Sequence, residues 1–209
     1  APNDPNSVAK GQVLAPTLPQ VKSDSQFSFG ATIRMEQPAQ GAVLSRMDSA
    51  LAYRGWDLFF QDGKPAVHIT DHWPDKGFKV VADQPLATGV WNHVMVTFDG
   101  RKKGIAAVSI HVNGKAVKTS PEVNNPGSDF TVEAPFRVGA RSKGATELDS
   151  PVSGNVSVQN VRFLSSALTP EQVRGLMGRD VIRQFAEAPP EKRSPEQRNA
   201  VFALYLTEF

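Results

Sequence analysis

Cysteine is absent from this chain of 209 residues, so disulfides and thiolate metal sites are excluded. A strong charge of one sign is also absent, because 23 Lys and Arg oppose 21 Asp and Glu, for a formal net charge of +2. This balance argues against a nucleic-acid binder, which needs a basic face. No run of about 18 apolar residues occurs, so no membrane span is expected. The first residues, APNDPNSVAKG, lack the apolar run of a signal peptide, although a start at Ala1 is compatible with removal of a targeting segment.

The residues that are present indicate a turn-rich β protein with one large domain. Sixteen Gly and sixteen Pro are scattered along the chain rather than repeated. The segment FSFGATIRME, from Phe27, alternates apolar and small or polar residues with period 2, which predicts a half-buried strand. Further strands are expected at GAVLSRMD, FRVGAR and GNVSVQNVRFL, the last with a bulge near Asn160 where the alternation slips. Many short strands with turns between them indicate a sandwich or jelly roll.

A hairpin is predicted around Asp62-Gly63, because this dipeptide suits a type I′ turn with positive φ at both positions. Strands are expected at residues 55–61 and 64–70. Counting outward from the turn places Trp56 on the apolar core face and sets Asp57 directly opposite His68 on the other face. A carboxylate and an imidazole so placed would interact, and the carboxylate would fix the orientation of the ring.

A second hairpin is expected from GVWNHVMVTFDG and AAVSIHVNG. Its register sets Met95 opposite His111 and His93 opposite Asn113. These histidines are candidate ligand-binding residues if they line the same face as His68, and the alternative is that they are structural polar partners within the sheet. Trp91 is expected to start a strand and to belong to the core.

The pattern changes near Thr169, where TPEQ and, later, SPEQ have the form of helix-capping boxes with proline at the first helical position. We therefore expect helices at about 170–185 and about 195–206. The second is apolar around much of its circumference, as if it packed against something further. The chain divides into an N-terminal extension with a possible first strand (1–26), a sandwich (27–168) and a helical extension (169–209) leading toward a further domain.

An ordered set of motifs resembles laminin G-like domains. GVWNHVMVTFDG is similar to their W-x-H-V-x-x-T-Y/F-D-G strand, SIHVNGKAV to the strand that follows, and NVRFLSSALTPEQVRGL to the closing segment. The resemblance runs from about Phe27 to Leu176 and implies an all-β, concanavalin A-like jelly-roll sandwich of two antiparallel sheets, followed by the two helices. It also implies a module of a large bacterial multidomain protein, located outside the cytoplasm in the periplasm or at the cell surface.

Relatives of this fold include sugar-binding lectins, calcium-dependent protein binders and β-glucanases, and the fold alone does not choose among them. Retaining glucanases need two carboxyl groups close together. The nearest match, ELDSPV at residues 147–152, lacks the final glutamate of the glucanase run and carries a proline where a strand should continue. Glu147 and Asp149 are therefore expected to be solvated loop carboxylates, and the protein is not expected to be an enzyme.

The six residues HITDHW at 68–73 are the most concentrated group of functional side chains. His68 is assigned to a strand, whereas Asp71, His72 and Trp73 are assigned to the loop that follows, so a zinc site is not expected. An exposed Trp73 beside polar groups would suit a sugar platform, and the alternative is a tryptophan that covers the sandwich edge. The candidate ligand-binding residues are Asp57, His68, Asp71, His72, Trp73, His93 and His111.

Calcium is the one cofactor considered, because oxygen atoms at strand ends are the ligands that this cation prefers. Asp48, Asp99 and Asn113 are weak candidates. The acidic pair that the resemblance would place before the closing strand is replaced by Gln159 and Asn160. The sequence thus favours a recognition module for a polysaccharide or a protein surface on the concave face or rim. The alternatives are a structural spacer that contacts neighbouring domains of the same chain and, less favoured, a glycoside hydrolase.

Overall fold

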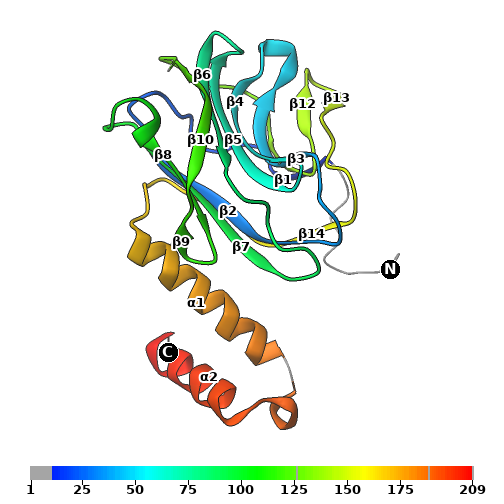
Figure 1. Ribbon diagram of the computed structural model, residues 1–209, viewed down its shortest axis with the longest axis vertical. Coiled ribbons are helices and arrows are strands. Elements are labelled where there is room, and N and C mark those ends of the chain that lie inside the picture. Colours follow the sequence, from blue (N-terminus) through cyan, green and yellow to red (C-terminus); the bar gives the residue numbers. More distant parts are fainter. Residues whose placement is uncertain (1–10, 126, 188, 209) are drawn as a thin grey trace.

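The computed structural model describes residues 11–125, 127–187 and 189–208, apart from several side chains of the C-terminal helices. Two sheets pack face to face, and two helices extend from one side of the sandwich (Figure 1). The expected jelly-roll sandwich of two antiparallel sheets is confirmed.

The larger sheet has nine strands, with the path β1-β11-β3-β4-β5-β6-β10 and with β12 and β13 attached beside β3. Its strands are β1 (Gln12–Ala15), β3 (Gly41–Asp48), β4 (Arg54–Gln61), β5 (Lys64–His72), β6 (Lys76–Ala82), β10 (Thr119–Asn125), β11 (Phe136–Val138), β12 (Arg141–Lys143) and β13 (Glu147–Asp149).

The smaller sheet has five strands in the order β14-β2-β7-β8-β9. They are β2 (Gln26–Met35), β7 (Asn92–Asp99), β8 (Val108–Val112), β9 (Lys115–Ala116) and β14 (Val156–Leu164). Short 3₁₀ turns lie at η1 (Ser49–Leu51), η2 (Gly104–Ala107) and η3 (Pro190–Lys192), and the helices are α1 (Pro170–Glu187) and α2 (Pro195–Glu208).

An aromatic cluster fills the space between the sheets. Trp56 is fully buried and its ring lies 4.4 Å from that of Phe29 and 5.3 Å from that of Phe136, between centroids. Phe27 and Phe163 complete the contact from the smaller sheet. Burying rings of this size contributes much of the stability of such a core. The inward face of the first hairpin is thereby fixed, and the polar face must point outward.

Both capping boxes form as the sequence predicts. The Thr169 amide donates to the Gln172 side chain at 2.8 Å, and Thr169 Oγ1 accepts from the Gln172 amide at 3.3 Å. Ser194 and Gln197 repeat the exchange at 2.9 and 3.3 Å. Each box satisfies amide groups that the first helical turn would otherwise leave unpaired.

Three local predictions are wrong. Asp71 and His72 belong to β5 and not to the following loop, because the turn at 73–75 is short and strand pairing continues to His72 opposite Lys76. Trp91 precedes β7 and is only half-buried, so it is neither a strand residue nor part of the core. Glu147 and Asp149 lie on β13, which pairs with β12, rather than in a loop.

Candidate functional site

The first hairpin brings Asp57 and His68 together on the outward face of the larger sheet. Asp62 and Gly63 have φ values of 52° and 75°, as a type I′ turn requires. From this turn the register runs through Gln61 opposite Lys64 to Asp57 opposite His68, as predicted. Since alternate residues of a strand point to opposite faces, the buried Trp56 in the core fixes Asp57 on the other side.

Asp57 is the centre of a buried charged network. Its carboxylate is fully buried and accepts from Arg141 Nε at 2.6 Å, and it lies 2.8 Å from His68 Nδ1. The His68 backbone amide donates to it at 3.3 Å. Burial alone would raise the pKa of Asp57, but the charges of Arg141 and His68 and their hydrogen bonds hold it below its usual range. Asp57 is therefore an anion at neutral pH and can only accept hydrogen bonds.

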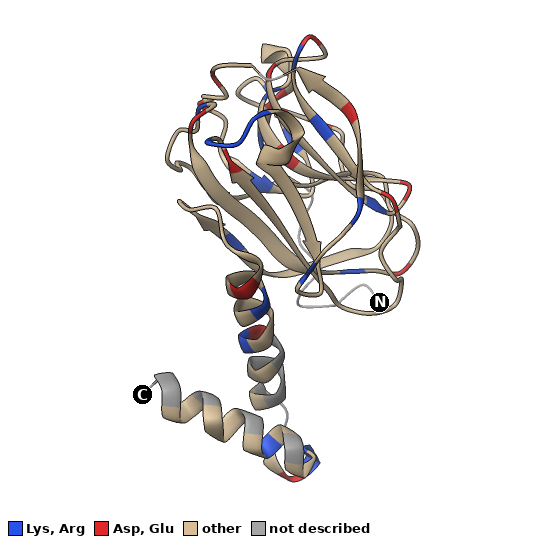
Figure 2. Ribbon diagram, turned by 60° about the vertical axis from the view of Figure 1, so that its left-hand side comes forward, with Lys and Arg blue, Asp and Glu red and all other residues tan. Residues whose placement is uncertain are grey.

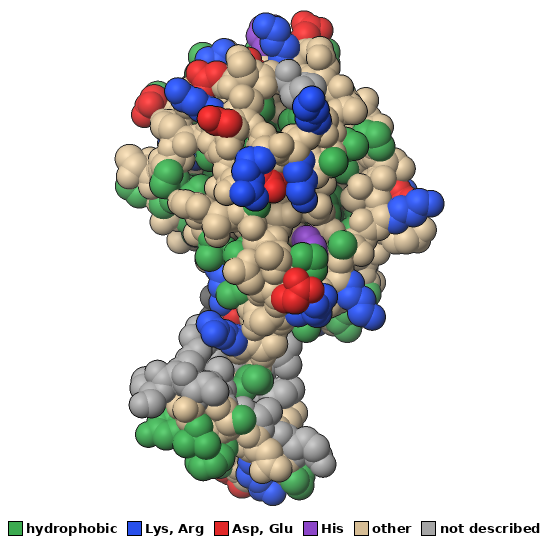
Figure 3. All heavy atoms as spheres, turned by 90° about the vertical axis from the view of Figure 1, so that its left-hand side faces the viewer, with side chains coloured by type: hydrophobic (Ala, Val, Ile, Leu, Met, Phe, Trp, Pro, Cys, Tyr) green, Lys and Arg blue, Asp and Glu red, His purple; other side chains and the backbone are tan. Residues whose placement is uncertain are grey.

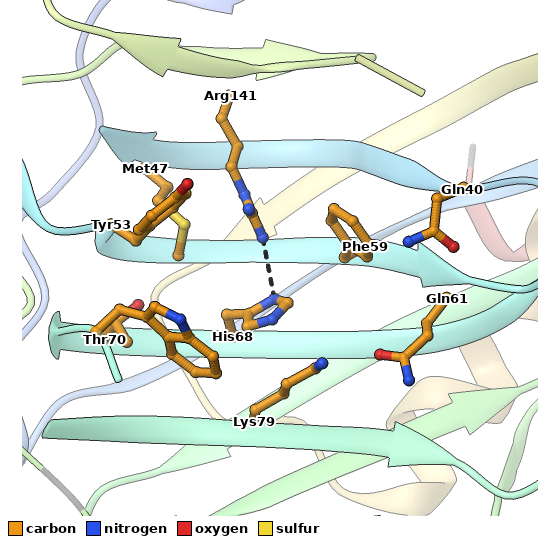
Figure 4. Close-up of a pocket in the computed structure, with 10 residues that line it drawn as sticks. Gln40, Met47, Tyr53, Phe59, Gln61, His68, Thr70, Lys79 and Arg141 are labelled. Atoms are coloured by element: carbon orange, nitrogen blue, oxygen red, sulfur yellow. Dashed lines mark hydrogen bonds between the residues drawn. The ribbon is translucent and has the colours of Figure 1, made fainter. Parts of the chain in front are cut away.

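The ionised state of Asp57 determines which atoms of its partners remain available. Because Asp57 Oδ1 accepts at 2.8 Å, His68 Nδ1 carries a proton and donates it. Arg141 Nη2 also lies 3.2 Å from His68 Nδ1, the contact drawn in Figure 4, but a protonated Nδ1 offers it no lone pair. His68 Nε2 has no hydrogen-bond partner among the described residues. A terminal N–H of Arg141 and the Nε2 edge of His68 are thus available to a ligand.

A pocket of about 250 Å³ opens above this network. Aromatic rings and polar side chains share its lining, and in Figure 4 Arg141 extends across the strands toward His68. The Arg141 guanidinium lies 4.7 Å from the centre of the Phe59 ring and 5.3 Å from that of Tyr53. The lining residues are Gln40, Met47, Tyr53, Phe59, Gln61, His68, Thr70, Trp73, Lys79 and Arg141.

Trp73 joins the pocket as one of its walls. Its ring meets the His68 ring edge to face, with centroids 5.4 Å apart and an interplanar angle of 79°. Phe59 meets the other side of the same imidazole at 5.6 Å. His68 is therefore held between two aromatic rings while Asp57 holds its Nδ1, so its orientation is fixed before any ligand arrives.

The other two residues of the HITDHW segment do not line the pocket. The Asp71 side chain accepts hydrogen bonds from Arg54 Nη2 at 3.2 Å and from the Ser128 amide at 3.3 Å. It therefore connects β4 and β5 to the 127–129 segment. His72 is exposed at the end of β5. Both contribute to the surroundings of the site rather than to its lining.

The calcium candidates lie apart and each is engaged with protein donors. Asp48 Oδ1 accepts from the amides of Ala50 and Gly144, at 2.9 and 2.8 Å. Asp99 binds the side chains of Arg101 and Gln26, and Asn113 accepts from the His93 amide. Across residues 11–125, 127–187 and 189–208, no group of three or more His, Asp or Glu side chains has the arrangement of a metal site.

His93 and His111 do not join His68. The predicted register of the second hairpin is confirmed for Met95 opposite His111, but these strands belong to the smaller sheet. Their outward face is covered by α1, where the buried Asp180 lies 3.7 Å from His93 Nε2. Burial lowers the pKa of both histidines. For His93 the Asp180 carboxylate opposes this shift without reversing it, and for His111 the charge of Arg174 lowers the pKa further. This second cluster lies at the contact between helix and sheet.

Acid is expected to destabilise the protein through these two histidines. A folded-state pKa below the unfolded value of about 6.5 means that the unfolded chain binds protons first as pH falls. Their contribution to the unfolding free energy is therefore present above about pH 6.5 and is lost toward pH 5. Measured by urea unfolding, the free energy of unfolding should fall less between about pH 6.5 and pH 5 in His93→Gln and in His111→Gln than in the parent. His72→Gln, at an exposed site, should keep the parent's loss, and equal losses in all variants would contradict the assignment.

The sequence did not identify several residues of the pocket. Arg141 ends the FRVGAR segment, which signalled only a strand, and it reaches Asp57 from 84 positions away in the chain. Tyr53 lies in the turn before β4, and Lys79 lies on β6, a strand that was not predicted. One feature of the sequence could have indicated a residue such as Arg141. The hairpin places Asp57 on a face without a cationic partner, and a buried carboxylate requires one.

The carboxylates considered for glucanase chemistry lie outside the pocket. Glu147 is exposed and pairs with Lys143, and Asp149 accepts from the Ser150 hydroxyl. Of the ten described lining residues, none is acidic. The pair of facing carboxyl groups that retaining hydrolysis requires is therefore not found among the residues that line this pocket.

Solved structures with the same architecture include several binding domains. The binding domain of Paraclostridial Mosquitocidal Protein 1 is 14% identical with a TM-score of 0.55, and the match covers 77% of this chain but only 38% of that one. A heptameric SAP-like pentraxin from Limulus polyphemus is 18% identical (TM-score 0.56; 79% of this chain and 73% of that one). The CBM40 domain of the Ruminococcus gnavus IT-sialidase, bound to α2,3 sialyllactose, is 11% identical (TM-score 0.53; 81% and 97%).

These similarities are at the level of the fold, and a search of curated proteins finds no matching relative. None of the described helices is long and apolar enough to cross a membrane. The model of one protein family matches residues 7–174, which include both sheets and the whole lining of the pocket. The chain belongs to the concanavalin A-like lectin/glucanases superfamily.

Proposed function

We propose that the protein is a non-catalytic recognition module that binds a glycan in the pocket above Asp57. The observation that carries this proposal is the composition of the pocket: aromatic walls and fixed polar groups on a rigid sheet. Small-molecule sites typically combine apolar walls with a few polar groups that set orientation. The CBM40 domain bound to sialyllactose supports the class of ligand, because it shares the architecture.

The walls suit a sugar ring. Tyr53, Phe59 and Trp73 offer aromatic surface to the C–H groups of a pyranose, while the side-chain amides of Gln40 and Gln61 and the His68 Nε2 can meet its hydroxyls. Asp57 takes no direct part, because it is fully buried and its oxygens are used by Arg141 and His68. It acts as the anchor that keeps these two side chains in place.

Trp73→Ala is the direct test of this site. Losing an aromatic wall should weaken glycan binding by about tenfold or more, as for other aromatic anchors of binding sites. Affinity would be measured by titration calorimetry with ligands first selected on a glycan array. Circular dichroism of the variant should match the parent, because Trp73 is only half-buried and lies at a turn.

His72→Ala is the matched control, since the neighbouring side chain is exposed and does not line the pocket. It should bind as the parent does. Equal affinity in Trp73→Ala and the parent would exclude this pocket as the glycan site. Binding reduced equally by both variants would place the ligand on the turn at 72–75 rather than in the pocket.

A second role is favoured by one observation on α2. Phe202, Tyr205 and Leu206 have exposed fractions of 62%, 59% and 63%, and Figure 3 shows hydrophobic side chains gathered on this part of the helical extension. Large exposed apolar residues that lie together often mark a contact surface. We propose that α2 docks on a neighbouring domain of a longer chain.

Phe202→Ser tests this docking, and its effect would be measured by limited proteolysis of this chain and of a longer chain. The substitution should increase protease sensitivity only in the longer chain. Equal protease sensitivity of the longer chain with and without the substitution would count against docking.

A further inference from the structure

The charges around the pocket indicate the class of glycan, an inference that rests on the proposed function. Two cationic side chains, Lys79 and Arg141, line the pocket, while none of its ten described lining residues is acidic. Elsewhere on the sandwich, acidic and basic residues are interspersed along the ribbon, as Figure 2 shows for one view. The lining of the pocket thus contains cations and no carboxylate among its described residues.

The carboxylates that pair with these cations lie outside the lining. Asp57 is fully buried beneath the floor and contacts Arg141 through Nε, which leaves terminal nitrogens of the guanidinium toward the pocket. Glu122 approaches Lys79 Nζ at 2.6 Å from the neighbouring strand β10 and is not a lining residue. Lys79 carries two further N–H donors, since an ammonium group has three.

The terminal N–H donors of Arg141 are poorly satisfied by acceptors of the protein. Its Nη2 lies 3.2 Å from His68 Nδ1, whose proton is committed to Asp57. Its Nη1 reaches only the Ser150 hydroxyl, at 3.4 Å, which is near the limit of a hydrogen bond. Arg141 as a residue is nonetheless only 6% exposed, and its guanidinium stacks on Phe59. A buried cation with poorly satisfied donors is stabilised by an anionic acceptor that enters from the pocket.

We infer that the pocket takes a sugar that carries an anionic group, a carboxylate or a sulfate. The anion lies between Arg141 and Lys79, and the sugar ring packs on the aromatic walls. Guanidinium groups bind planar carboxylates and sulfate oxygens through paired N–H donors, and such charge-assisted hydrogen bonds are about twice as strong as neutral ones. The pocket volume of about 250 Å³ suits a single sugar unit with its substituent.

Matched pairs of probes test the charge separately from the sugar. We would titrate the protein with sialyllactose and lactose, with an oligogalacturonide and its methyl ester, and with a sulfated galactan oligosaccharide and its desulfated form. The charged member of at least one pair should bind about tenfold more tightly, equivalent to one charge-assisted hydrogen bond. The pair whose charged member binds more tightly identifies the anionic group as a carboxylate or a sulfate. The preference should fall as salt is raised.

Lys79→Gln removes a cation of the pocket without removing either partner of the buried Asp57–Arg141 pair. It should reduce affinity for the charged probe several-fold more than affinity for the neutral probe. Lys76→Gln is the control, because Lys76 lies on the same strand, is exposed and does not line the pocket. It should keep the parent's preference.

The outcomes separate this inference from the proposed function. Equal binding of charged and neutral probes, with loss in Trp73→Ala, would overturn the anionic ligand and leave a glycan site in place. A preference for charged probes that survives in Lys79→Gln would also overturn the placement of the anion. No binding of any probe on an array of neutral, sialylated, uronic-acid and sulfated glycans would overturn both.

Discussion

Replacing Asp57 with alanine is expected to lower the free energy of unfolding by about 3–5 kcal/mol, as in other proteins that lose one partner of a buried ion pair. The variant leaves the guanidinium of Arg141 buried without its counter-charge, and it removes the acceptor that orients His68. The cost arises mainly from the unpaired cation. Urea unfolding of the parent and the variant at pH 7 would measure it.

The pH dependence of this loss has a defined sign. The folded-state pKa of Asp57 is held below its unfolded value of about 3.9, so the stability that it contributes is present above that value and is lost in stronger acid. The difference between parent and Asp57→Ala should therefore shrink as pH falls below about 4. A difference that stays constant to low pH would show that the lost packing, and not the charge, was responsible.

Two comparison variants separate charge from shape. Asp57→Asn keeps an acceptor for His68 and removes the charge, so it should still be destabilised by the unpaired Arg141. Asp57→Ala combined with Arg141→Met replaces both partners by apolar groups and should recover much of the loss, because no charge is then buried alone. A double variant as unstable as the sum of the two single variants would contradict the network.

The part of the site nearest in sequence could be predicted. A two-residue turn fixes the register of the strands beside it, so the Asp62-Gly63 turn and the apolar Trp56 face were enough to place Asp57 opposite His68. Trp73 could be associated with the same site because it follows within five positions of His68. Local geometry, propagated over a few residues, carries this much information.

The remaining parts depend on pairings between distant segments, which no local pattern specifies. Arg141 reaches Asp57 only because β12 attaches beside β3, and Lys79 reaches the pocket because β6 pairs with β5. His93 and His111 were considered together with His68 because all three face outward from strands, yet outward faces of two different sheets look alike in sequence. Their different surroundings follow from the position of α1, whose Asp180 packs against His93 on the smaller sheet and whose Arg174 lies near His111.

That helix contact carries the second large expected effect. Asp180 on α1 has a side chain only 3% exposed and receives two hydrogen bonds from Arg162 of β14, at 2.7 and 2.5 Å. Asp180→Ala should therefore cost about 2–3 kcal/mol, less than the about 3–5 kcal/mol of a fully buried pair, because the Arg162 side chain is itself 20% exposed. The loss concerns the attachment of α1, so the sandwich should remain folded while the helix becomes sensitive to protease.

Limited proteolysis with mass mapping would locate the effect, and Glu171→Ala provides the matched control. Glu171 lies on the same helix and pairs with Arg174 at 2.7 Å, but both side chains are exposed, so its loss should leave proteolysis and stability unchanged. Cleavage confined to 165–187 in Asp180→Ala, with glycan binding retained, would show that the helix contact and the pocket are independent. Loss of glycan binding in the same variant would instead mean that the smaller sheet supports the geometry of the pocket through the shared aromatic core.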